Sequence, residues 1–258
     1  MGFPCIDLLT DIKADYFVIP RYSILPYAFD QMREITNIGA TAINSYQQHS
    51  YVAELGAYVR DLEDLTPKTW RNLYDLPDDG TSFVLKGATN SIKQRFSTHM
   101  FAKTKHDASK VHSLLCDDTL ISEQQIYIRE YVPLVNYMIG IGGCPVSKEF
   151  RFFIAYGQVL CGAFYWQNYA DDLPSIPSVD EVPQEFLQEV INRIGNNINF
   201  YVVDVAQKKA DGDWMVVELN DGRTRSITQL PAYPMIQSHQ GSTVASSMSI
   251  TGISSRIG

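Results

Sequence analysis

Three oxygen-bearing side chains interrupt two apolar segments in the second half of the chain. Asp204 stands within residues 200–206, where Val and aromatic residues otherwise prevail. Glu218 and Asn220 stand two positions apart within residues 214–220, a segment of similar composition. Mg²⁺ prefers hard oxygen ligands and is usually held in proteins by one or two carboxylates together with substrate phosphates. These residue types therefore predict a magnesium site, with an exposed hairpin whose acidic residues face water as the alternative.

A hairpin is the element that must bring these three groups together. Val and aromatic residues favour strands, and the Asp-Gly pair that begins at Asp211 is a strong turn signal between the two segments. If the turn is centred on Asp211, Asp204 lies opposite Glu218, and Val202 lies opposite Asn220. Directly paired residues share a face of the sheet with Cβ atoms about 5 Å apart, so one small cation can reach all three groups.

Two lysines flank a loop of small residues nearer the N-terminus. Lys86 ends the predicted strand 82–86, and the following Gly-Ala-Thr-Asn-Ser-Ile run leads to Lys93. Lys supplies a mobile positive charge, and small residues let backbone amides approach phosphate oxygens closely. The pattern indicates a loop that covers phosphates, and the alternative is a solvated Lys at a strand edge.

The sequence Glu130-Tyr131-Val132 ends another predicted strand, 125–132, immediately before a proline. A strand end of this kind can present alternating carbonyl and amide groups to the edge of an adenine, with an apolar wall from Tyr131 or Val132. A plain strand terminus is the alternative interpretation.

Arg151 stands among large apolar residues in a second predicted hairpin, which turns at Tyr156. In that register Arg151 lies opposite Gly162, which leaves space above the strand for a ligand. An isolated Arg on a sheet face needs an anionic partner. The sequence leaves open whether this partner is Glu149, Glu130 or a bound phosphate.

The rest of the chain predicts further helices and strands around these groups. A periodic apolar pattern predicts a helix over residues 186–194, and Ser97 or Thr98 is the expected cap of a helix that runs towards Leu115. The other expected elements are a strand at 15–20, a helix at 25–38, extended structure at 41–52 and a connecting helix or linker at 61–76.

Composition and motif spacing exclude several classes of protein. The 258 residues carry a net charge of -8 without Lys/Arg runs, which argues against a nucleic-acid or anionic-membrane binder. No apolar run approaches the ~20 residues that span a bilayer, and the N-terminus lacks a signal pattern, so we expect an intracellular, cytoplasmic protein. The run Gly140-Ile-Gly-Gly143 has the wrong spacing for a dinucleotide fingerprint, and no Cys-x-x-Cys pair suggests zinc.

Taken in chain order, the candidate groups resemble the ATP-grasp superfamily. The resemblance covers residues 76–230 and is closest to the clade named for two arginines and a lysine, which is related to the cell-division-cycle protein 123 family. It is carried by Phe83-Val-Leu-Lys-Gly-Ala-Thr-Asn-Ser-Ile-Lys93, Ile128-Arg-Glu-Tyr-Val-Pro-Leu134, Glu149-Phe-Arg151, Val203-Asp-Val205 and Val217-Glu-Leu-Asn-Asp-Gly222.

This resemblance implies an α+β ATP-grasp fold, in which two α/β subdomains with antiparallel sheets clasp a nucleotide. It implies an N-terminal pre-ATP-grasp α/β unit at residues 1–75 and an ATP-grasp domain at residues 76–232. Residues 233–258 are expected to form a low-complexity tail, because Ser, Gly and Thr dominate there.

The resemblance also implies ATP and Mg²⁺ as cofactors and a role for each candidate residue. Gln167, Asn168 and Arg223 are expected to face the substrate, because they flank the predicted phosphate site. The implied cofactor contacts are Lys86 with Lys93 on the phosphates, Glu130, Tyr131 and Val132 on the adenine, Arg151 on the transferred phosphate or an anionic substrate, and Asp204, Glu218 and Asn220 on Mg²⁺. Lys86 and Arg151 are the residues implied in catalysis.

The function implied is that of a ligase for a small-molecule or peptide carboxylate and an amine. Superfamily members typically phosphorylate a carboxylate with ATP and let an amine or similar nucleophile attack the acyl phosphate, which needs positioning and charge neutralisation rather than a protein nucleophile. The alternative is an ATP-binding assembly factor with little turnover and a protein partner, like the cell-division-cycle relatives. A kinase that stops at the phosphorylated product is a third interpretation.

Overall fold

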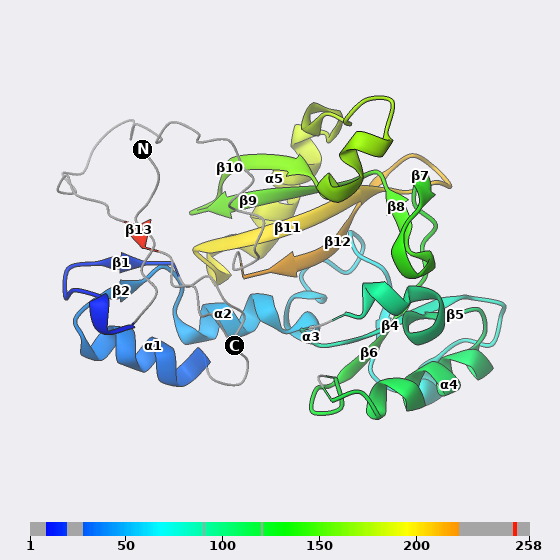
Figure 1. The fold of residues 1–258 in the computed structure, drawn as a ribbon, viewed down its shortest axis with the longest axis horizontal. Helices are drawn as coiled ribbons and strands as arrows, with labels where there is room; N and C mark the ends of the chain where they lie inside the picture. The colour runs from blue at the N-terminus through cyan, green and yellow to red at the C-terminus, as the bar shows by residue number, and fades with distance from the viewer. Residues whose placement is uncertain (1–8, 20–27, 90, 120, 222–249, 252–258) are drawn as a thin grey trace. The chain divides into compact units, whose positions relative to one another are not determined.

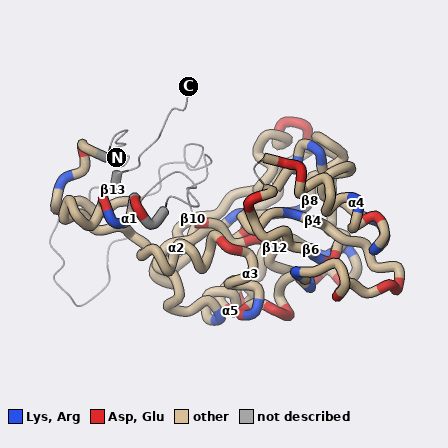
Figure 2. Tube along the Cα trace, turned by 90° about the horizontal axis from the view of Figure 1, so that it is seen from below, with Lys and Arg blue, Asp and Glu red and all other residues tan. Residues whose placement is uncertain are grey.

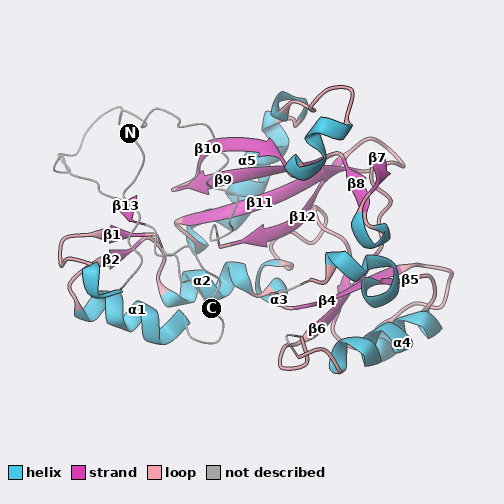
Figure 3. Ribbon diagram, in the orientation of Figure 1, coloured by secondary structure: helices cyan, strands magenta, loops and turns pink. Residues whose placement is uncertain are grey.

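The structure, a computed structural model, describes residues 9–19, 28–89, 91–119, 121–221 and 250–251 (Figures 1 and 3). The chain divides into two compact units, one of residues 1–49 and 221–258 and the other of residues 50–220. Every predicted site residue except Arg223 lies in the second unit, and Arg223 lies outside the described residues. The predicted division of the chain at residues 75 and 232 remains a prediction. No helix in the described part of the chain has the length and apolar character needed to cross a membrane.

The first unit contains a small parallel sheet of order β13-β1-β2. Its strands are β1 (Phe17–Val18), β2 (Thr41–Ala42) and β13 (Ile250–Thr251), and α1 (Ala28–Asn37) lies between β1 and β2 in sequence. Buried Val18 and Ile35 belong to its apolar core. The predicted strand-helix-strand order of this region is confirmed.

The expected extended structure at residues 41–52 was wrong beyond β2. The chain forms α2 (Tyr46–Ala53) instead. Ser45 and Gln48 make a reciprocal capping box, since the Gln48 backbone N–H donates to Ser45 Oγ at 3.2 Å and the Ser45 N–H donates to Gln48 Oε1 at 2.9 Å. These contacts satisfy N–H groups that a helix start leaves unpaired, so the polar pair favours a helix here.

In residues 50–220, a small antiparallel sheet has the order β3-β6-β4-β5. Its strands are β3 (Thr69–Trp70), β4 (Phe83–Gly87), β5 (Phe101–Ala102) and β6 (Ile126–Glu130), and α4 (Lys105–Cys116) packs against it. Buried Phe83, Leu85 and Ile128 form its core with Val111 and Leu115 of α4. The strand β3 lies within residues 61–76, which were expected to form a connecting helix or linker, so that part of the segment is instead an edge strand of the sheet.

The expected cap of α4 at Ser97 or Thr98 was wrong. Thr104 begins the helix with an extended backbone, and its side-chain oxygen accepts a hydrogen bond from the Asp107 N–H at 3.2 Å. Residues Phe96–Met100 form a π-type turn, and β5 follows that turn before α4 starts. The intervening strand separates the two predicted caps from the helix.

The larger sheet in residues 50–220 has the order β10-β9-β11-β12 and is antiparallel throughout. Its strands are β9 (Glu149–Ala155), β10 (Gln158–Phe164), β11 (Phe200–Gln207) and β12 (Trp214–Asn220). The predicted helix is α5 (Gln184–Ile194), whose buried Leu187, Val190 and Ile194 pack with alternate residues of β9 and β11. This packing leaves the opposite face of the sheet for the polar residues.

The pairing of β11 with β12 confirms the predicted register, with Val202 opposite Asn220 and Asp204 opposite Glu218. The predicted register of β9 with β10 was wrong by one residue, because Arg151 pairs with Ala163. An irregularity between Val159 and Cys161 inserts one extra residue into β10, and such bulges shift every pair beyond them.

The remaining elements of residues 50–220 are short. A two-stranded antiparallel hairpin joins β7 (Asn136–Ile139) to β8 (Pro145–Ser147), and α3 (Leu55–Tyr58) follows α2. Six 3-10 turns complete the description of this unit: Leu73–Asp75, Lys93–Arg95, Ile141–Gly143, Gln167–Asp172, Val179–Glu181 and Gly195–Asn197. A further such turn, Leu9–Asp11, belongs to the first unit.

Candidate functional site

One row of paired residues crosses the larger sheet and carries opposite charges side by side. Arg151 of β9 pairs with Asp204 of β11, which pairs in turn with Glu218 of β12. Since directly paired residues point to the same face, all three side chains lie on the face opposite α5. A bulge after Asp204 places an extra residue, Val217, in β12 and keeps Glu218 on that face.

Asp204 is held by Arg151 through two parallel hydrogen bonds. Arg151 Nε donates to Asp204 Oδ1 at 2.7 Å, and Arg151 Nη2 donates to Asp204 Oδ2 at 2.7 Å. Both side chains are buried. Burial opposes the charge of Arg151, but Asp204 outweighs it and raises the pKa of the guanidinium. Of the partners left open by the sequence, neither Glu149 nor Glu130 forms this ion pair.

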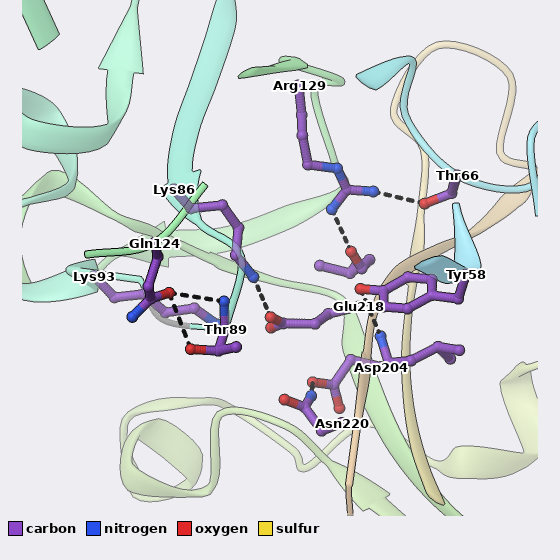
Figure 4. A network of polar contacts seen from close by, with 12 residues as sticks. Tyr58, Thr66, Lys86, Thr89, Lys93, Gln124, Arg129, Asp204, Glu218 and Asn220 are labelled. Atoms are coloured by element: carbon purple, nitrogen blue, oxygen red, sulfur yellow. Dashed lines mark hydrogen bonds and ion pairs between the residues drawn. The ribbon is translucent and has the colours of Figure 1, made fainter. Parts of the chain in front are cut away.

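Lys86 of β4 forms an ion pair with Glu218 of β12, so a cation of the small sheet meets a carboxylate of the larger one (Figure 4). Lys86 is buried and Glu218 is half-buried. Burial alone would raise the pKa of Glu218, but the attraction of Lys86 and Lys93 more than offsets it and lowers that pKa. Glu218 is therefore a carboxylate anion at neutral pH. Acidic and basic positions likewise lie close together around β4, β6 and β12 in Figure 2.

The predicted metal ligands lie together as hard oxygen donors. Asn220 Nδ2 donates to Asp204 Oδ2 at 3.2 Å. Within the described residues, neither Asn220 Oδ1 nor Glu218 Oε2 has a hydrogen-bond donor. Two carboxylates and an amide oxygen fit Mg²⁺, which keeps several waters and needs few protein ligands. The third donor of this set is the amide of Asn220. Among the described residues, no three His, Cys, Asp or Glu side chains are grouped in a way that could hold a metal.

Lys93 lies in the 3-10 turn after the small-residue loop. Its Nζ donates a hydrogen bond to the Tyr165 hydroxyl at 2.5 Å. Burial opposes the positive charge, but Tyr165, Glu149 and Glu218 together raise the pKa of Lys93 above its ordinary value. Lys93 is thus a cation directed into the same region as Lys86.

Two contacts hold the loop that joins Lys86 to Lys93. The backbone N–H and the hydroxyl of Thr89 both donate to Gln124 Oε1 at 3.0 Å (Figure 4). At the other end, Gly142 in the β7–β8 connection lies so close that a Cβ there would be 2.2 Å from the Gln94 carbonyl oxygen. With φ of 63° as well, only glycine fits Gly142 without strain.

A cavity of about 360 Å³ lies beside these groups, within the usual volume range of small-ligand sites. Its polar lining includes Lys86, Lys93, Arg129, Glu149 and Glu218. Apolar side chains from several elements complete the wall, among them Val84, Phe96, Met100, Ile139, Trp166 and Met215. The cavity therefore combines charged groups with an apolar wall.

The predicted hinge lines this cavity. The Glu130 N–H donates to the Lys68 carbonyl at 2.9 Å, and the Tyr131 N–H donates to the Ser82 carbonyl at 2.8 Å. The Val132 N–H has no hydrogen-bond acceptor in the part of the chain that the structure describes. Of the three amides, that of Val132 is the one left to a ligand.

The predicted residues fall into three groups in the structure. Lys86, Lys93, Glu130, Tyr131, Val132 and Glu218 line the cavity, while Arg151, Asp204 and Asn220 share the adjoining sheet face without lining it. Gln167 and Asn168 are exposed in their 3-10 turn, where Gln167 Nε2 donates to the Phe164 carbonyl at 2.9 Å. These two residues are therefore not brought to the cavity.

The predicted site residues did not include three charged residues that line the cavity, Arg129, Glu149 and the exposed Lys209. Arg129 is buried on β6, where its guanidinium donates to the Val217 carbonyl at 2.5 Å and to Thr66 Oγ1 at 2.6 Å. It supports the bulge beside Glu218, and a lone Arg in an apolar strand was the signal for it. Glu149 is 3% exposed, and its Oε1 has no hydrogen-bond partner among the described residues. No spacing in the sequence marks Glu149.

Comparisons with known proteins agree on this fold. Residues 78–230 match the model of an ATP-grasp domain family, the third family of the clade named for two arginines and a lysine. The structure is similar to a RimK domain protein ATP-grasp from Sphaerobacter thermophilus, with a TM-score of 0.54 and 15% identity over 83% of this chain and 76% of that one. No curated protein matches the chain by sequence.

Two further solved structures are similar. D-alanine–D-alanine ligase from Bacillus anthracis, complexed with ATP, has a TM-score of 0.51 and 15% identity over 78% of this chain and 64% of that one. Pyruvate carboxylase from Rhizobium etli has a TM-score of 0.56 and 12% identity over 82% of this chain and 19% of that one. At these identities the similarity concerns the fold, and this chain spans less than two thirds of either protein.

Proposed function

Because the chain belongs, through residues 78–230, to the ATP-grasp clade named for two arginines and a lysine, we propose that it is an ATP- and Mg²⁺-dependent ligase. In this proposal a carboxylate is activated as an acyl phosphate and then attacked by an amine or similar nucleophile. The observation that carries it is the meeting of two cations, Lys86 and Lys93, with the carboxylate of Glu218 in the lining of one cavity of small-ligand size. Such an arrangement suits a phosphate chain with its metal.

Bound ATP with Mg²⁺ would supply the γ-phosphoryl group, which passes to a carboxylate oxygen as ADP leaves, and phosphate leaves when the nucleophile attacks the acyl carbon. Lys86 and Lys93 hold the phosphates by charge, while Glu218, Asp204 and Asn220 offer oxygens to the metal. Arg151 stands next to Asp204, where it neutralises charge that develops on the transferred group. No side chain has to act as a nucleophile.

The part of the cavity lined by Tyr131 and Val132 suits an adenine. The N–H of Val132, which has no acceptor among the described residues, can donate to a ring nitrogen, and the backbone around it is already fixed by the bonds of Glu130 and Tyr131. Tyr131 is in turn held by an edge-to-face contact with Phe101, with ring centroids 4.9 Å apart. A preorganised edge of this kind binds a planar base with little ordering cost.

The substrate is proposed to be a small-molecule or peptide carboxylate with an amine partner, and the name of one fold relative, D-alanine–D-alanine ligase, supports such a reaction. A direct test incubates the protein with ATP, Mg²⁺ and panels of carboxylates, amino acids and peptides, and measures ADP together with the coupled product by mass spectrometry. Substrate-dependent ADP and an amide product are expected. Both should be abolished in Lys86→Met and retained in Lys110→Met, which changes an exposed Lys of α4.

The outcomes separate the competing functions. Tight ATP binding without ADP release across the panel, with a co-purifying protein, indicates an assembly factor instead. ADP release with a phosphorylated acceptor and no amide indicates a kinase. Absence of ATP binding by calorimetry in the presence of Mg²⁺ contradicts the proposed function altogether.

A further inference from the structure

Tyr165, just beyond the end of β10, contacts two cations of the site, Lys93 and Arg151. Lys93 Nζ lies 4.1 Å from the centroid of the Tyr165 ring and donates to its hydroxyl at 2.5 Å. The Arg151 guanidinium carbon lies 4.7 Å from the same centroid. Contacts of a cation with an aromatic face are attractive and become stronger when water is excluded. One ring therefore holds two positive charges that would otherwise repel each other.

The ring is itself fixed to the larger sheet. The Tyr165 N–H donates to the Glu149 carbonyl at 2.8 Å, and the ring packs edge to face on Trp166 with centroids 5.0 Å apart. The Trp166 indole N–H is shared between Ser147 Oγ and Glu149 Oε2 at 3.2 Å each. Tyr165 is thus anchored to β9 through its own N–H and through Trp166.

Lys93, by contrast, comes from a 3-10 turn with few backbone bonds of its own. A long Lys side chain on such a turn has many rotamers, and ordering it costs conformational entropy. The hydroxyl and the two rings of Tyr165 and Trp166 select one of them, with the Trp166 centroid 5.1 Å from Nζ. The position of this ammonium is therefore set by the sheet rather than by its own loop.

From these contacts we propose that Tyr165 is a positioning residue, which holds Lys93 at the phosphate end of the cavity and keeps it apart from Arg151. The proposal rests on the proposed function, because it takes Lys93 to contact nucleotide phosphates. Tyr165 acts through Lys93 and need not touch the nucleotide, since it does not line the cavity. A side chain that only filled space in this position would be replaceable by Leu without effect on phosphate binding.

The test is a double-mutant cycle on the full chain, read by calorimetric affinity for a non-hydrolysable ATP analogue with Mg²⁺. Tyr165→Phe keeps the ring and should weaken binding about fivefold, because it removes one hydrogen bond to a charged group. Tyr165→Leu also removes the ring and should weaken binding about thirtyfold. In a Lys93→Met background, the same two changes should alter the affinity less than about twofold. Additive losses in that background would overturn the proposal.

A second measurement tests positioning without any nucleotide. Amide hydrogen exchange over residues 91–97 of the ligand-free protein should be faster in Tyr165→Leu than in the parent chain. The double variant Lys93→Met/Tyr165→Leu should exchange no faster over these residues than the single variant Lys93→Met. Tyr74→Leu is the matched control, because Tyr74 is 93% exposed and does not line the cavity. Unchanged exchange in Tyr165→Leu overturns the proposal even if ATP binds. Coupled exchange in a chain that binds no nucleotide overturns the proposed function and leaves the Tyr165–Lys93 coupling intact.

Discussion

The two four-stranded antiparallel sheets of residues 50–220 hold their charged side chains in different ways. On the larger sheet, Arg151, Asp204 and Glu218 occupy one row of directly paired residues, and their positions follow from strand register. On the small sheet, Lys86 lies on a paired strand, but Lys93 and the segment after Glu130 lie beyond strand ends. Those groups are placed by contacts with other elements, such as Tyr165 on Lys93. One half of the site is therefore preset by the sheet and the other half is assembled from distant segments.

This difference predicts the largest loss of stability on the larger sheet. Asp204→Ala removes the bidentate partner of buried Arg151, and breaking a buried ion pair typically costs about 3 kcal/mol or more. The free energy of unfolding from urea titration should fall by about that amount. Asp171→Ala, an exposed carboxylate, is the control and should change it by less than about 0.5 kcal/mol. Equal effects of the two changes would mean that the row is not held by this pair.

On the small sheet, the expected effect is on binding. Lys86→Met keeps the length of the side chain but removes the charge beside Glu218, so the affinity for the ATP analogue with Mg²⁺ should fall roughly tenfold to a hundredfold. Calorimetry measures this, with Lys110→Met of α4 as the control. An unchanged affinity would remove Lys86 from the phosphate site.

Gly142 tests whether the assembled half depends on close contact between segments. Gly142→Ala places a Cβ 2.2 Å from the Gln94 carbonyl oxygen in addition to a positive φ, and should lower the free energy of unfolding by about 2 kcal/mol. Gly80→Ala is the matched control, since Gly80 has φ of 91° but no atom within 4 Å of such a Cβ. The excess of the first loss over the second measures the contact, and equal losses would show that backbone strain alone is responsible.

The smallest expected effect is a pH dependence from Glu149. Burial raises the pKa of its carboxyl above the ordinary value of 4.5, although Lys93 opposes the shift. A raised folded-state pKa contributes stability that is complete below about pH 4.5 and is lost as the pH rises through the folded-state value. Glu149→Gln should remove this decline from a series of urea titrations at increasing pH. A parallel decline in both proteins would assign it to other groups.

The same difference explains what could be predicted from the sequence. The pairing of Asp204 with Glu218 was predicted correctly only because of a bulge: next to the turn Gln207 pairs with Trp214, one residue away from the predicted register, and the extra residue in β12 restores the predicted pair. The register of Arg151 failed by one residue because Gly162 was interpreted as space for a ligand, whereas a Gly inside a strand can also mark a bulge such as the one between Val159 and Cys161. The Lys93–Tyr165 contact joins residues 72 apart, and no local pattern reports on such a pairing. Arg129 could have been identified by the reasoning applied to Arg151.

The ion pairs Lys86–Glu218 and Arg151–Asp204 have a thermodynamic consequence for the proposed function. Phosphates that take the cations would leave two carboxylates without their partners, and a metal that takes the carboxylates would leave two cations without theirs. Either ligand alone therefore breaks these pairs without replacing them, whereas both together satisfy every charge. The binding of nucleotide and of Mg²⁺ should accordingly be linked by a favourable coupling free energy. By reciprocity, each should raise the affinity of the other by the same factor.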